Sequence, residues 1–67
     1  MKAVIVIPTY NEANSIGKMI DYLFEKVFPS VKGWTCQILV VDDTSPDGTY
    51  KIVAEKQKKY QDLFLSL

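Results

Sequence analysis

Two short runs of consecutive apolar residues constrain the fold of this chain more than any other feature. AVIVI occupies residues 3–7, and CQILVV occupies residues 36–41. Both runs are rich in β-branched residues, which favour strands. Neither run shows the alternation of apolar and polar residues that is typical of a strand with one solvated face. We therefore predict two strands buried on both faces, as in a parallel sheet.

The segment between these runs has the spacing of an amphipathic helix. Apolar residues recur at intervals of three and four, the period of one helix face. They are Ile16, Met19, Ile20, Leu23, Phe24 and Val27. Asn14 or Ser15 can cap the start of this helix, and Pro29 lies just beyond its predicted end.

A second helix is expected after the polar loop DDTSPDG, from about residues 47–49 to Tyr60, with Ser45 or Asp47 as its cap. Its inward residues are predicted to be Ile52, Val53, Lys56 through its aliphatic stem, and Tyr60. Its exposed face is predicted to carry Lys56, Lys58 and Lys59, with Glu55 paired to Lys59 one turn away. The closing LFLSL, residues 63–67, predicts a third strand.

The order strand, helix, strand, helix, strand predicts an α/β fold with a Rossmann-like parallel sheet, connected by right-handed crossovers. A chain of 67 residues has room for one small domain. The loops PTYNEAN and DDTSPDG follow the first and second strands. Both loops are therefore expected at the carboxyl edge of the sheet, where such folds bind ligands.

Composition excludes several classes of function. Eight basic and eight acidic residues give a net charge of zero, so no basic surface for nucleic acid or anionic membranes is expected. The chain has no His, which excludes Ser-His-Asp and Cys-His nucleophiles, and its one Cys, Cys36, cannot form an internal disulfide. Both apolar runs are far shorter than the ~20 residues of a membrane helix. A cytoplasmic localisation fits these features best.

Side chains in the two loops are the candidates for binding. The Tyr10 ring can stack on a base or sugar, whereas Asn11 and Glu12 can form hydrogen bonds or simply cap the helix. The adjacent carboxylates Asp42 and Asp43 must face opposite sides as they leave a strand. A carboxylate at this edge can accept hydrogen bonds from ribose hydroxyls or ligate a divalent cation.

VIPTYNEANSI and ILVVDDTSPDGT together resemble the N-terminal part of family-2 glycosyltransferases of the GT-A fold. The SPDGT ending is similar to the dolichyl-phosphate or polyprenyl-phosphate mannosyltransferase branch. This resemblance implies transfer of a sugar from a nucleotide diphosphate donor, GDP-mannose in that branch, to a polyprenyl phosphate. It implies that residues 1–67 are a single partial domain, the nucleotide-sugar donor-binding half of the enzyme.

The resemblance also assigns positions in the donor site. Pro8, Tyr10 and Glu12 match the first donor-binding cluster of the family, and Val41 and Asp43 match the second. Asp42 is the weaker match of the two adjacent carboxylates, and Asp47 belongs to the family signature but can equally act as a helix cap. Relatives often have Gly where this chain has Thr44.

The Asp-x-Asp loop that binds the metal in this family would lie beyond Leu67. No catalytic or metal-binding residue is therefore expected within the fragment, which should be inactive alone. The parent enzyme is expected to use a divalent cation, Mg²⁺ or Mn²⁺, and to act at the cytosolic face of a membrane. Within the fragment, an exposed sheet edge predicts self-association.

Two alternatives have different functions. ILVVDD also resembles the first strand of response-regulator receiver domains, but here a strand and a helix precede it and only a short segment follows. A non-catalytic nucleotide-binding α/β module would differ from the transferase only in what lies downstream, where an Asp-x-Asp motif would favour the enzyme.

Overall fold

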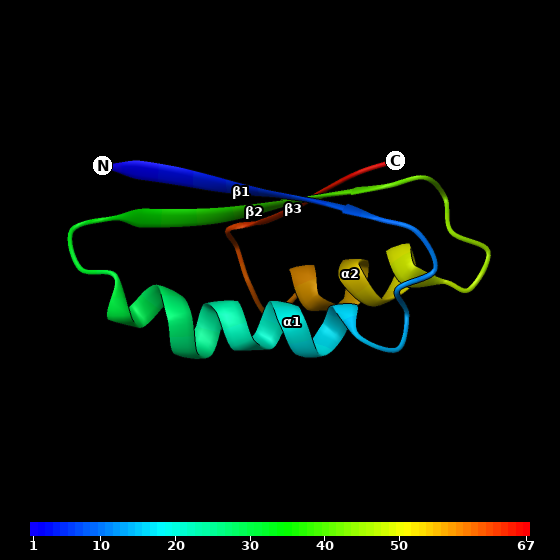
Figure 1. The fold of residues 1–67 in the computed structure, drawn as a ribbon, viewed down its shortest axis with the longest axis horizontal. Helices are drawn as coiled ribbons and strands as arrows, with labels where there is room; N and C mark the ends of the chain where they lie inside the picture. Colours follow the sequence, from blue (N-terminus) through cyan, green and yellow to red (C-terminus); the bar gives the residue numbers. More distant parts are fainter.

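Three parallel strands form the sheet, in the order β1 (Lys2–Thr9), β2 (Thr35–Asp42) and β3 (Leu63–Ser66). The structure, a computed structural model, describes residues 1–67. Figure 1 shows both helices on one face of the sheet. Two successive right-handed crossovers that advance in the same direction place their helices on the same face. The predicted Rossmann-like α/β fold is confirmed.

The register of β1 and β2 fixes the edge where the two polar loops emerge. Pairing runs from Lys2 opposite Thr35 to Thr9 opposite Asp42, so the carboxyl ends of both strands are level. β1 extends past the predicted run of residues 3–7 and ends at Thr9, so Pro8 lies within the strand. A proline is tolerated here because β1 is an edge strand, where one side of the backbone needs no partner.

The first helical segment is less regular than predicted. α1 (Ile16–Tyr22) continues through a π-helical turn (Leu23–Val27) and a 3₁₀ turn (Phe28–Ser30), so Pro29 lies inside the helical path. Proline is accepted there because it occupies the start of the 3₁₀ turn, where its missing N–H costs no hydrogen bond. Ser15 precedes α1, but its side chain caps no N–H group of the helix.

The second helix, α2 (Thr49–Gln57), starts where the sequence predicts and ends before Tyr60. The core lies between the sheet and the two helices. It consists of Ile16 and Ile20 from α1, Ile38 and Val40 from β2, Val53 from α2 and Leu63 from β3. Neither α1 nor α2 has the length and apolar composition of a membrane-spanning helix.

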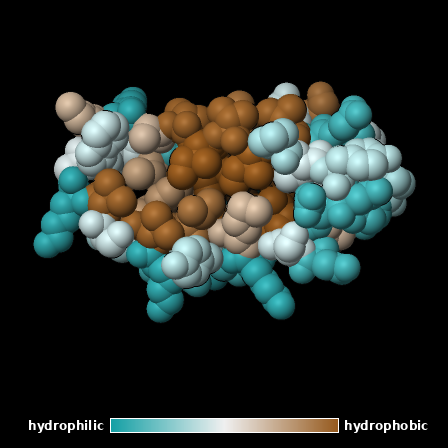
Figure 2. All heavy atoms as spheres, viewed as in Figure 1, coloured by the Kyte–Doolittle hydropathy of each residue, from teal (hydrophilic) through white to brown (hydrophobic).

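The prediction that the strands are buried on both faces is wrong for this chain. Val4 and Val6 on β1 are 54% and 57% exposed, and Phe64 on β3 is 45% exposed. In Figure 2 hydrophobic atoms gather at the top of the view, on the side of the sheet away from the helices. The reason is topological, because both helices cover the same face and the opposite face receives none.

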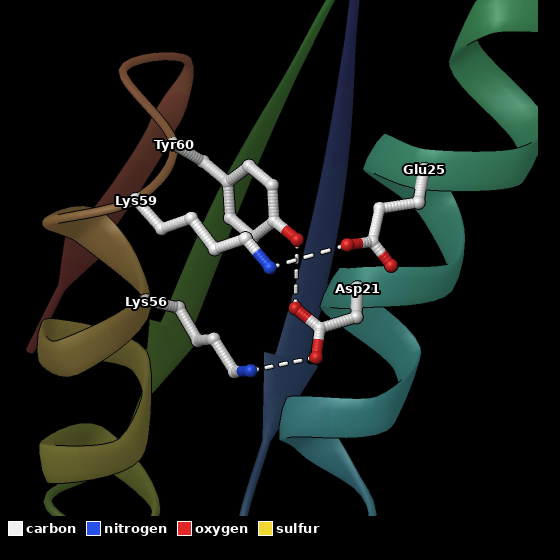
Figure 3. A network of polar contacts seen from close by, with 5 residues as sticks. All are labelled: Asp21, Glu25, Lys56, Lys59 and Tyr60. Atoms are coloured by element: carbon white, nitrogen blue, oxygen red, sulfur yellow. Dashed lines mark hydrogen bonds and ion pairs between the residues drawn. The ribbon is translucent and has the colours of Figure 1, made fainter.

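Polar side chains join the two helices at their outer margin (Figure 3). Lys56 Nζ lies 2.6 Å from Asp21 Oδ2, and the Tyr60 hydroxyl donates to Asp21 Oδ1 at 2.8 Å. Lys59 pairs with Glu25 at 3.1 Å. The expected solvated lysine face is confirmed for Lys58 and Lys59, whose side chains are 77% and 57% exposed. It is wrong for Lys56, which is 26% exposed because Asp21 of the neighbouring helix lies within reach.

The expected pair of Glu55 with Lys59 is also absent. Glu55 pairs instead with Lys58, at 3.4 Å. The Tyr60 ring stacks on Phe24 with centroids 4.3 Å apart, which draws the end of α2 toward the first helical segment.

Candidate functional site

The two polar loops meet at the carboxyl edge of the sheet. We call residues 10–15 the first loop and residues 43–48 the second loop. Because Thr9 is paired with Asp42, Tyr10 and Asp43 are each the first residue past the paired ends of adjacent parallel strands. The expectation that both loops emerge at one edge is confirmed.

Asp42 ties the two strand ends together from within. It is 1% exposed, and its carboxylate accepts hydrogen bonds from the Thr9 hydroxyl at 2.8 Å, the Ser45 N–H at 2.9 Å and the Ser45 hydroxyl at 2.6 Å. Burial acts to raise the pKa of Asp42, but the hydrogen bonds from Ser45 and Thr9 outweigh it and hold that pKa below its usual value. Asp42 is therefore an ionised residue whose oxygens are occupied by the protein.

Three successive backbone N–H groups of the first loop are bound by side chains of the DDTSPDGT segment. We call these three contacts the cross-loop clamp. They are Asn11 N–H to Ser45 Oγ at 3.0 Å, Glu12 N–H to Thr49 Oγ1 at 2.9 Å, and Ala13 N–H to Asp47 Oδ2 at 3.0 Å. The partners are 34 to 37 residues apart in the sequence, so the clamp is a tertiary feature.

Asp47 connects the clamp to the start of α2. Its Oδ1 accepts the Thr49 N–H at 3.1 Å and the Thr49 hydroxyl at 2.5 Å, so it binds the first residue of α2. The expectation that Ser45 or Asp47 is the cap is wrong, because Gly48 occupies the N-cap position and no side chain caps the helix there. The Thr49 hydroxyl lowers the pKa of Asp47 most, and the N–H groups of Ala13 and Thr49 add to this against the effect of burial. Asp47 therefore holds a negative charge between the first loop and α2.

Two non-glycine residues in the loops have left-handed backbone conformations that local sequence patterns did not predict. Asn11 has φ of 55° and Thr44 has φ of 47°. Asn adopts this region readily, but a β-branched residue such as Thr rarely does. The family resemblance, in which Gly often stands where this chain has Thr44, was the available signal, because Gly populates positive φ without a Cβ clash.

The remaining residues of the predicted site are exposed at this edge. Asp43 has no hydrogen-bond partner, and the Tyr10 side chain is 56% exposed. The Glu12 carboxylate is also exposed and accepts the Ser15 hydroxyl at 3.2 Å. Pro8 and Val41 are register partners just before the loops. The structure thus brings all the predicted site residues to one rim.

The rim is open on its outer side. The chain encloses no pocket, and no three His, Cys, Asp or Glu side chains converge on a point where a metal ion could bind. The predicted contact of Asp42 with the nucleotide-sugar stays a prediction, and its oxygens already accept hydrogen bonds from the protein. The oxygens of the neighbouring Asp43 carboxylate are not bound by any other residue.

Comparison with known proteins identifies the family. Glycosyl transferase family 2 matches residues 4–65, nearly the whole chain. The chain belongs to this family. Its membership agrees with the parallel β-α-β-α-β order and excludes the receiver-domain alternative, in which ILVVDD would form the first strand.

Individual relatives of this family-2 chain carry related names. It is 38% identical over 60 residues to a dolichol-phosphate mannosyltransferase of Pyrococcus furiosus, covering 90% of this chain and 16% of that protein. It is 36% identical over 59 residues to the glycosyltransferase AglE of Haloferax volcanii, covering 88% of this chain and 18% of that protein.

A solved structure with the same fold is the mannosyltransferase PcManGT from Pyrobaculum calidifontis, determined in complex with GDP-Man and Mn²⁺. The TM-score is 0.71 at 36% sequence identity, and the match covers 96% of this chain and 18% of that one. The family-2 chain thus spans less than a fifth of the length of each of these three proteins.

Proposed function

We propose that residues 1–67 form the donor-nucleotide half of a glycosyltransferase that moves mannose from GDP-mannose to a polyprenyl phosphate. The single observation that carries this proposal is the placement of Tyr10 and Asp43 just past the level ends of adjacent parallel strands. Ligands of such sheets bind in the crevice outside the carboxyl ends of the strands. The family match and the GDP-Man complex of the similar mannosyltransferase support the choice of donor.

Each proposed contact follows from the chemistry of its side chain. Asp43 accepts hydrogen bonds from ribose hydroxyls or from the edge of the base, since no protein group occupies its oxygens. Tyr10 offers an exposed ring for stacking on the nucleoside. Glu12 supports the same contact from the first loop, and Pro8 with Val41 forms the apolar border of the rim.

A divalent cation, Mg²⁺ or Mn²⁺, is proposed for the parent enzyme, with ligands outside residues 1–67. The described residues do not fit a metal site of their own, because no group of three suitable side chains converges. The acceptor phosphate is likewise expected to be bound by other parts of the parent, at the cytosolic face of a membrane.

The test is calorimetric titration of the full-length parent protein, which contains these residues, with GDP. Replacing Asp43 by Ala should weaken GDP binding by roughly tenfold or more, because a hydrogen bond to a charged group typically contributes about 1.5–3 kcal/mol. Asp62→Ala is the matched control, because Asp62 directly precedes β3 and so lies at the opposite, amino edge of the sheet. That variant should bind GDP as the unmodified chain does.

The outcome also separates the proposed enzyme from a binding module. Unchanged GDP affinity in the Asp43→Ala variant would refute the assignment of the site. GDP binding without transfer of mannose to a polyprenyl phosphate would favour the non-catalytic nucleotide-binding module instead.

A further inference from the structure

Three side chains of the SPDGT segment, Ser45, Asp47 and Thr49, bind backbone N–H groups of the first loop. We propose that Ser45, Asp47 and Thr49 are positioning residues for the donor site, which hold the first loop so that Tyr10 and Glu12 face the nucleoside. This inference rests on the proposed function, but it concerns residues that are absent from the proposed contact set.

The hydrogen-bond pattern separates this role from ordinary helix capping. A capping residue binds N–H groups of its own helix. Here the N–H groups of Asn11, Glu12 and Ala13 are bound by side chains of a segment 34 to 37 residues away. Consecutive N–H groups of an isolated loop would point in different directions, so binding all three specifies one conformation of the first loop.

The bound segment includes a backbone conformation that needs support. Asn11, with φ of 55°, lies between Tyr10 and Glu12, and it is the residue whose N–H binds Ser45. On the second loop, Thr44 with φ of 47° lies between Asp43 and Ser45, whose N–H and hydroxyl are held by Asp42. Both left-handed residues are therefore next to a proposed nucleoside contact. The clamp bond from Asn11 N–H to Ser45 Oγ involves Asn11 itself and the residue that follows Thr44.

Burial shows that Ser45 and Thr49 act through the loop and not on a ligand, whereas Asp47 is exposed and its carboxylate is engaged by Ala13 and Thr49. Ser45 is 1% exposed and Thr49 is fully buried, so neither hydroxyl is available to a bound nucleotide. The Thr49 hydroxyl accepts from Glu12 N–H and donates to Asp47. Removing the Thr49 hydroxyl would leave the Glu12 N–H without its acceptor and Asp47 Oδ1 without one of its donors. Both groups belong to the junction of the two loops.

A pair of substitutions at Thr49 isolates the hydroxyl. Thr49→Val keeps the shape of the side chain but loses the hydrogen bonds, whereas Thr49→Ser keeps the hydroxyl. In GDP titrations of the full-length parent protein, Thr49→Val should weaken affinity about tenfold, and Thr49→Ser should stay within about twofold. The fitted stoichiometry reports the folded fraction, so a loss of fold alone would lower the stoichiometry and leave affinity unchanged.

The same substitution in a Tyr10→Ala background tests the route of the effect. If the clamp acts by placing Tyr10, the penalty of Thr49→Val should shrink to about threefold or less once the ring is absent. Amide hydrogen exchange at residues 11–13 should be faster in Thr49→Val than in Thr49→Ser. If Thr49→Val fails to fold, Asp47→Asn replaces it, since it removes one acceptor oxygen at nearly constant size.

The outcomes distinguish this inference from the proposed function. An unmodified chain that does not bind GDP overturns the proposed function, and the inference with it. An unmodified chain that binds GDP, while Thr49→Val or its substitute binds equally well, overturns the inference alone. An equal penalty with and without the Tyr10 ring overturns the placement of Tyr10 by the clamp.

Discussion

At the scale of single residues, two adjacent carboxylates have opposite environments. Asp42 is buried and accepts three hydrogen bonds, whereas Asp43 is exposed and accepts none from the protein. The difference follows from the strand, in which consecutive side chains face opposite sides of the sheet. One carboxylate therefore stabilises the loop junction while the next is free to bind a ligand.

Thr44 gives the residue-scale prediction. Its φ of 47° is costly for a β-branched side chain, so Thr44→Gly should relieve strain. We expect the free energy of unfolding to rise by about 1 kcal/mol or less, because the greater freedom of Gly in the unfolded chain offsets part of the gain. Urea unfolding measures this change.

Thr44→Val is the control for that experiment. It keeps the β-branch and the positive φ, so it should show no gain in stability. A Gly variant less stable than the unmodified chain would contradict the presence of backbone strain at this position.

At the scale of elements, the two helices are joined by a network centred on Asp21. Its carboxylate binds Lys56 and the Tyr60 hydroxyl, and the Lys56 contact is the main cause that lowers the pKa of Asp21. The side chains of Asp21 and Lys56 are 31% and 26% exposed, so water screens the pair only in part. The network therefore fixes how α1 and α2 lie against each other.

Asp21→Ala should lower the free energy of unfolding by about 1–2 kcal/mol, because it removes a half-buried ion pair and a hydrogen bond. Chemical unfolding measures the loss. Glu55→Ala is the matched control, since Glu55 pairs with Lys58 where both side chains are more than 70% exposed. Its cost should be under about 0.5 kcal/mol, and equal costs at the two sites would contradict the role of the network.

At the scale of the whole molecule, the ionisable groups predict a broad plateau of stability with pH. Hydrogen bonds lower the pKa values of Asp21, Asp42 and Asp47 in the folded state, although burial opposes them. Their stabilisation is present above the unfolded pKa of about 3.9 and is lost as pH falls through the lower folded values. The acid side of the plateau should therefore end near pH 4.

The alkaline side has the opposite sign. The hydrogen bond to Glu25 raises the pKa of Lys59, and burial raises the pKa of Tyr60. Their stabilisation is present below the unfolded pKa values of about 10 and is lost as pH rises through the folded values. With no His in the chain, urea unfolding should give a constant free energy between about pH 5 and 9. A marked slope near neutral pH would contradict this assignment of the groups.

The order of the elements could be read from the sequence because it depends on local patterns. β-branched runs favour strands, and the spacing from Ile16 to Val27 is that of a helix. Parallel pairing then followed from the alternation of strands and helices, and with it the common edge for Tyr10 and Asp43. These features depend only on residue types and their spacing, so a single amino-acid sequence is sufficient to predict them.

What only the tertiary structure decided was which groups meet across the fold. The sequence offers Ser45, Asp47 and Thr49 as turn and capping residues, and nothing local reveals that they bind N–H groups more than thirty residues away. Lys59 pairs with Glu25 and not with the predicted Glu55 for the same reason. Hydrogen bonds and ion pairs depend on distance and direction in space, which local propensity does not encode until the helices and strands have packed.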